Sequence, residues 1–207
     1  MTDEGGSDAA AKDDAVADKE ENRFYTEDRW HNWLDRVENE DLDPEDEESA
    51  RLLINLQDDA AIAVAKVVSA REEGVVDDET AVEELQRIHE IVLTEVEFED
   101  EDALMLIDGV QTSLVPVFYA AEEYVAAGAS TDASVAEYVH AAADAETQDN
   151  LDAALGYVVQ AGTRVVDGDD LDMAVVEELE YGLVAEWVNG LDSLQSALTD
   201  PEVVEDD

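Results

Sequence analysis

The sequence of 207 residues contains no cysteine, which excludes disulfides, thiolate nucleophiles, iron–sulfur clusters and cysteine-type zinc sites. Histidine is scarce, with only His31, His89 and His140 present. Glycine-rich phosphate loops, the GxSxG nucleophile motif and the dinucleotide-binding fingerprint are also missing. These absences remove most of the common catalytic machinery. They favour a non-enzymatic protein with no catalytic residue, metal or cofactor, although they leave the enzyme question open.

Basic side chains are rare, because ten Lys and Arg stand against 58 Asp and Glu and give a formal charge of -48. No stripe of Lys and Arg is available to displace counterions from phosphates, so direct nucleic-acid binding is not expected. In dilute buffer so many like charges would repel one another across a folded surface. At about 1 M salt the Debye length falls to roughly 3 Å. We therefore predict a halophilic protein of a salt-rich cytoplasm.

Long uncharged apolar runs are missing as well. Residues 1–22 lack the apolar segment of a signal peptide, and the nearest approach to a membrane span, residues 103–128, contains Asp108, Glu122 and Glu123. A buried core helix is the better interpretation of that segment. The hydrophobic fraction of 45% suffices for one folded core. We expect a cytoplasmic protein that does not contact a membrane.

Apolar residues recur at every third or fourth position, which is the period of the α-helix. The pattern predicts an all-α bundle of about seven helices with short connections. One domain is expected over residues 23–198, between a disordered acidic extension (1–22) and an acidic tail (199–207). Cap residues predict helix starts at Thr26, at Asp43 followed by Pro44, at Asp77 or Asp78, at 99–102, and at Thr131, Asp149 and Asp172.

A faint internal echo leaves a degenerate duplicated hairpin open as an alternative. Residues 82–85 (VEEL) recur at 176–179, and residues 107–110 (IDGV) have a counterpart, VNGL, at 188–191. Val, Glu and Asp are so abundant in this chain that such matches arise easily by chance.

A carboxylate-bridged metal centre, with redox or hydrolytic activity, is the competing enzyme hypothesis. Such a centre inside a helix bundle needs Glu-x-x-His on two helices and Glu on two more. Glu137 and His140 have this spacing, and Asp28 and His31 have it loosely. In a chain so rich in acids the match carries little weight, so no metal site is predicted.

Four other polar residues stand in apolar stretches. We expect His89 to be a hydrogen-bonded residue at the core edge and Arg164 to pair with a neighbouring carboxylate. Burial would raise the pKa of Asp58 or Asp108. We favour the interpretation in which each carboxylate is paired with a neighbour or still reaches solvent. Three glycines within predicted helices are expected to allow close helix crossings: Gly109, Gly182 and Gly190.

The segment 23–37 (RFYTEDRWHNWLDRV) differs from the rest because it holds three of the seven arginines and two of the three tryptophans. Arg and Trp dominate the energetics of protein interfaces. We predict a partner-binding site at Arg29, Trp30, Trp33 and Arg36. The alternative is that Trp30 and Trp33 fasten this helix to its own bundle.

Four stretches together resemble an archaeal family classed as domain of unknown function 2150, found in haloarchaea and methanogens. They are FYTEDRWHNWLDRV, DLDPEDEESARLLINLQDD, LMLIDGVQTSLVPVFYAAEEYV and EYGLVAEWVNGLDSLQSAL, and the likeness covers about residues 23–198. The resemblance implies an archaeal cytoplasmic protein and supplies no activity or site residues. We expect an accessory or interaction protein that binds a protein partner or itself, with attachment to RNA-handling machinery as one candidate role.

Overall fold

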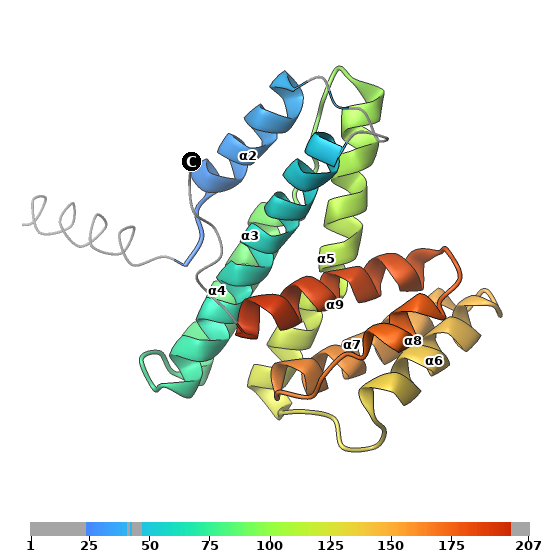
Figure 1. Cartoon of the computed structure of the whole chain (residues 1–207). Helices are drawn as coiled ribbons and strands as arrows, with labels where there is room; N and C mark the ends of the chain where they lie inside the picture. The colour runs from blue at the N-terminus through green and yellow to red at the C-terminus, as the bar shows by residue number, and fades with distance from the viewer. Residues whose placement is uncertain (1–23, 41, 43–46, 200–207) are drawn as a thin grey trace, which may run out of the picture.

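The computed structural model describes residues 24–40, 42 and 47–199, and over these ranges it consists of helices and loops with no strand (Figure 1). This confirms the predicted all-α bundle. The described residues form eight helices: α2 (Glu27–Asn39), α3 (Glu47–Glu72), α4 (Asp78–Val92), α5 (Glu101–Ala127), α6 (Val135–Glu146), α7 (Leu151–Val166), α8 (Met173–Glu177) and α9 (Leu183–Thr199).

Side-chain caps begin four helices where the sequence predicted them, namely α2, α4, α5 and α8, the last of which is capped by Asp172. The hydroxyl of Thr26 accepts a 3.2 Å hydrogen bond from the Arg29 amide, and the Asp77 carboxylate accepts one of 2.9 Å from the Thr80 amide. Asp100 caps α5 in the same way. Each acceptor satisfies an amide that has no partner within the helix, which fixes the first turn.

Several predictions concern parts of the chain outside the described residues. These are the N-terminal extension 1–22, the tail beyond Thr199, and the start of the second helix at Asp43 and Pro44. Thr199 itself is the last residue of α9.

The starts of α6 and α7 correct the sequence prediction. The first turn of α6 is capped by Ser134 rather than Thr131, because Ser134 and Glu137 exchange hydrogen bonds in a capping box. Asp149 has a φ of 58°, in the left-handed region, so the following Asn150 caps α7 in its place.

The last predicted helix, 172–198, is divided into α8 and α9. The amides of Leu183 and Val184 donate to Oε1 of Glu146, at 2.7 and 3.3 Å. Glu146 ends α6, so its side chain caps a helix distant in sequence. Gly182 lies just before α9 and outside any helix, so the prediction that it allows a helix crossing is wrong; a Cβ there would lie 2.7 Å from the same Glu146 oxygen. The apolar period continues across the break, and the sequence therefore did not show it.

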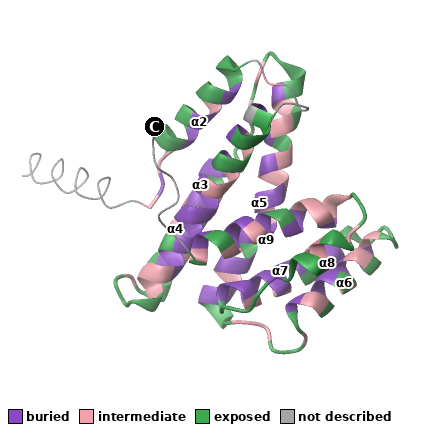
Figure 2. Cartoon of the chain, in the orientation of Figure 1, coloured by how far each residue is buried: buried purple, intermediate pink, exposed green. Residues whose placement is uncertain are grey.

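Helix α5 is central, and α3, α4, α7 and α9 all pack against it (Figure 1). Helix α6 packs on α7. Residues 59–68 of α3 are buried except Lys66, and Figure 2 shows this buried stretch in the lower half of the helix. One large core cluster runs through the bundle, from Tyr25 to Leu194.

Glycines mark two of the closest helix crossings. A Cβ added to Gly190 of α9 would collide with the carbonyl of Ser113 in α5, so the predicted close crossing at Gly190 is confirmed. Gly162 of α7 serves the same purpose, since its added Cβ would lie 2.5 Å from that of Ala120. The prediction for Gly109 is wrong, because a Cβ there would meet nothing within 4 Å.

Among the described residues, α5 is long and apolar enough to cross a membrane. Core helices of globular proteins often meet the same criterion. Half of its most apolar window is buried inside this fold.

The segments of the internal echo are equivalent in only one of the two pairs, since residues 107–110 lie inside α5 and residues 188–191 inside α9. Residues 82–85 lie within the fifteen-residue α4, whereas residues 176–179 cross the end of the five-residue α8. The two pairs of helices therefore do not form equivalent hairpins.

Candidate functional site

The predicted partner-binding tryptophans lie in the core of the chain. Trp30 is fully buried and Trp33 is 8% exposed, both on the face of α2 that turns toward the bundle. Arg36 is exposed and its guanidinium lies 4.7 Å from the centre of the Trp33 ring, a cation–π contact. This burial agrees with the alternative interpretation, in which the tryptophans fasten α2 to the bundle.

Asp59, which no sequence pattern distinguishes from the other acidic residues, connects Trp33 and Arg29. The buried Asp59 carboxylate accepts a hydrogen bond of 2.9 Å from Trp33 Nε1, and the Arg29 guanidinium forms an ion pair with it. Burial, and then the nearby Asp59 charge, raise the pKa of Tyr25 well above its ordinary value. The group therefore binds α2 to α3.

The residues with metal-ligand spacing have other roles. Glu137 belongs to the cap of α6, and its hydrogen bonds to Ser134 lower the pKa of the Glu137 carboxyl. His140 lies 3.5 Å from Glu178, and His31 Nδ1 lies 2.8 Å from the carbonyl of Glu27. Over the described ranges, no three His, Asp or Glu side chains come together in a way that could hold a metal ion.

Arg164, Asp58 and Asp108 have the structural surroundings expected for them. Arg164 pairs with Asp169 and donates a 2.8 Å hydrogen bond to the carbonyl of Ser130. Burial raises the pKa of Asp58, which keeps part of its surface in solvent. Asp108 is exposed.

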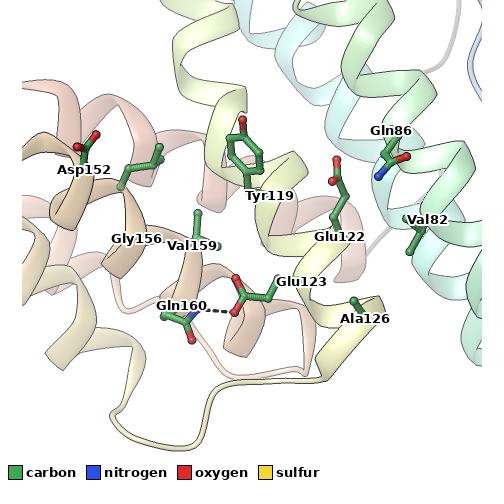
Figure 3. Close-up of a pocket in the computed structure, with 11 residues that line it drawn as sticks. Val82, Gln86, Tyr119, Glu122, Glu123, Ala126, Asp152, Gly156, Val159 and Gln160 are labelled. Atoms are coloured by element: carbon green, nitrogen blue, oxygen red, sulfur yellow. Dashed lines mark hydrogen bonds between the residues drawn. The ribbon is translucent and has the colours of Figure 1, made fainter.

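A surface groove of about 550 Å³ is formed by α4, α5 and α7 (Figure 3). Helix α5 supplies Tyr119, Glu122, Glu123 and Ala126, which lie between residues of the other two helices. Several lining side chains are exposed, so the groove is open along its length. We call it the α4–α5–α7 groove.

Carboxylates supply the charge of this groove. They are Glu122, Glu123 and Asp152, and none of the residues that line it is Lys or Arg. Glu123 accepts a 2.7 Å hydrogen bond from the Gln160 amide, which holds one carboxylate in a fixed position across the groove (Figure 3). The groove therefore presents negative charge with no Lys or Arg among its lining residues, while the imidazole of His89 lies against Glu122.

The rest of the groove is lined by small and apolar residues together with Gln86, Gln160 and Tyr119. Val82, Leu155 and Val159 contribute aliphatic surface, and Ala126 is exposed beside them. Gly156 lies in the middle of α7, where a Cβ would meet nothing within 4 Å. Packing does not require glycine here, although glycine in a helix interior costs about 1 kcal/mol relative to Ala. Its effect is to widen the groove.

His89 borders the groove and is hydrogen-bonded at the core edge, as predicted. Its Nδ1 lies 3.1 Å from Glu122 Oε1, and its ring stacks on Phe118 at 5.2 Å between centroids. The edge of Tyr119 meets the same ring at 5.3 Å. These contacts fix the orientation of the Glu122 and Tyr119 side chains that face the groove.

No local sequence pattern indicates this groove, because its residues come from three helices whose relative positions follow from the tertiary fold. One signal was available: Gly156 interrupts an otherwise good apolar helix, with no turn or chain reversal to explain it.

Comparison with known proteins places the chain in a family without assigning it an activity. No curated protein and no solved structure matches the sequence. A family model described as "Uncharacterized protein conserved in archaea (DUF2150)" matches residues 23–207, which is nearly the whole chain. The chain belongs to this archaeal family.

Proposed function

We propose that the chain is a non-enzymatic interaction protein that binds a partner protein in the α4–α5–α7 groove. The observation that carries this proposal is Gly156, a helix-interior glycine that neither packing nor backbone geometry requires and that opens space in the groove. A residue that lowers helix stability without helping the fold is expected where a ligand needs room.

The shape of the groove favours a macromolecular partner over a small molecule. Sites for small ligands enclose about 70–90% of the ligand surface. Gln86, Tyr119 and Asp152 are exposed at the groove, so a small molecule there would stay largely in water. A segment of a folded protein can cover an open groove and exclude water from its centre.

The setting proposed for this interaction is a salt-rich archaeal cytoplasm. The charge of -48 supports this setting, since only concentrated salt screens such repulsion at short range. Attachment to RNA-handling machinery and self-association stay predictions from the sequence.

Capture of partners at native salt tests the proposal. Wild-type protein and two variants, Gly156→Met and Gly109→Met, are used as bait in cytosol at molar KCl, and captured proteins are quantified. Both glycines are in helices with open space around the Cβ, but only Gly156 lies in the groove. We expect a defined set of proteins to be lost with Gly156→Met and retained with Gly109→Met. Equal retention by the two variants would refute binding in the groove.

A further inference from the structure

We infer that the α4–α5–α7 groove binds a short basic amphipathic helix of the partner, whose Lys or Arg side chains contact Glu122, Glu123 and Asp152. This inference rests on the proposed function and adds the chemistry of the partner. Its foundation is the combination of an aliphatic groove surface with three carboxylates and no basic lining residue.

A helical occupant follows from the secondary structure that surrounds the groove. An extended peptide gains affinity by adding a strand to a sheet edge, but the described residues contain no strand. Recognition must therefore come from side chains, as in complexes where an amphipathic helix lies in an apolar groove. Tyr119 to Ala126 covers about 10 Å along α5, roughly two helical turns, which suits an occupant of a few turns.

The carboxylates define the charge of that helix. Gln160 donates to only one oxygen of Glu123, and burying a carboxylate oxygen without a partner is costly, so an occupant that covers Glu123 or Asp152 is favoured if it supplies a cation or a hydrogen-bond donor. Lys and Arg combine that cation with an aliphatic stem, and the stem can lie on Val82 and Leu155. In molar salt, long-range attraction is screened within about 3 Å, so only such direct contacts remain effective.

A second copy of this chain does not have the required charge. Its ten basic residues are outnumbered by 58 acidic ones, and Arg29, Arg71 and Arg164 are already paired with carboxylates of their own chain. A second copy would therefore bring carboxylates against carboxylates, which is unfavourable at direct contact.

Two synthetic peptides test this inference. Both form amphipathic helices of about four turns with the same apolar stripe, and one carries Lys at the flanking positions where the other carries Gln. Fluorescence anisotropy in molar KCl gives their affinity for wild-type protein and three variants: Asp152→Asn, Gly156→Met and Asp108→Asn. Asp108 is the control, because it is an exposed carboxylate of α5 that does not line the groove.

We expect the Lys peptide to bind at least about tenfold more tightly than the Gln peptide. Asp152→Asn should remove most of that preference, Gly156→Met should abolish binding of both peptides, and Asp108→Asn should change neither. Equal affinities for the two peptides, or no binding of either, would overturn the inference. The proposed function would still stand if Gly156→Met released the captured proteins. A dimer in light scattering that Gly156→Met dissociates would also overturn the inference, because the occupant would then be a second copy.

Discussion

The indole Nε1 of Trp33 donates a 2.9 Å hydrogen bond to the buried carboxylate of Asp59. The same carboxylate pairs with Arg29, so α2 is held to α3 by one charged group inside the fold. Loss of a buried, hydrogen-bonded ion costs several kcal/mol, since its partners are left unsatisfied. We expect Asp59→Ala to lower the free energy of unfolding by about 3 kcal/mol, measured by urea denaturation in molar salt. The neighbouring half-buried Asp58 is the control, and Asp58→Asn should cost less than about 1 kcal/mol. Similar losses at both positions would contradict this account of Asp59.

The burial of Trp30 makes a second prediction about α2. Truncation of a fully buried Trp removes its packing and leaves a cavity, so Trp30→Ala should cost about 3–5 kcal/mol of unfolding free energy. Arg36→Ala removes only an exposed cation–π contact and should cost less than about 1 kcal/mol. If the urea midpoint of Trp30→Ala equalled that of the wild type, the Trp30 side chain would lie at the surface and not in the core.

From the raised pKa of Tyr124 we predict how the stability of the fold changes at alkaline pH. The Tyr124 hydroxyl lies 3.1 Å from Glu72 Oε1 and 3.2 Å from Asp167 Oδ1, and burial together with these carboxylates raises the pKa of Tyr124 to about 12. The folded chain therefore keeps a proton that the unfolded chain releases near pH 10. Stability from this group is complete below about pH 10 and is lost as pH rises to about 12. The melting temperature of the wild type should fall more steeply over this range than that of Tyr124→Phe. Parallel curves for the two proteins would be inconsistent with the raised pKa.

Replacement by Ala should change the stability of the fold in opposite directions at two helix-interior glycines, Gly156 and Gly190. Gly156→Ala adds a methyl group in open space and removes a flexible residue from α7, so it should stabilise the free chain by about 0.5–1 kcal/mol. Gly190→Ala forces the added Cβ against the Ser113 carbonyl and should lower the melting temperature by several degrees. Thermal unfolding followed by circular dichroism measures both effects. A loss of stability in Gly156→Ala would mean that the fold itself needs this glycine.

The sequence predicted the fold class and most helix starts because these depend on local signals. Thr26 and Asp77 lie just before amphipathic segments, and their caps are in the expected places. The break before α9 depends on Glu146, which reaches it from α6 across the bundle. A helical period continues through that break, so no local pattern could reveal it.

The candidate site was less predictable than the fold. Composition drew attention to Arg29 and Trp33, but the partner that decides their role, Asp59, lies on another helix. In a chain with 58 acidic residues, one buried carboxylate has no distinctive sequence signal. The groove likewise depends on the relative positions of α4, α5 and α7, which only the tertiary structure supplies.

The acidic composition predicts that the fold depends on salt. When KCl is lowered from molar to about 0.1 M, the Debye length rises from about 3 to about 10 Å and more of the carboxylates repel one another. The melting temperature and helical circular dichroism should both fall, and mild acidification at low salt should partly restore them because protonation removes charge. An unchanged melting temperature after desalting at neutral pH would contradict the proposed salt-rich setting.

Site-specific photo-crosslinking tests most directly whether a partner lies in the α4–α5–α7 groove. A photoreactive residue replaces Ala126, which is exposed in the groove, or Ala50, which is exposed on α3 outside it. Irradiation in native cytosol at molar KCl is followed by mass spectrometry of the crosslinked peptides. We expect crosslinks from position 126 to a Lys- or Arg-rich helical segment of one partner, and none to that segment from position 50. Crosslinks to the partner from position 50 but not from position 126 would contradict this expectation.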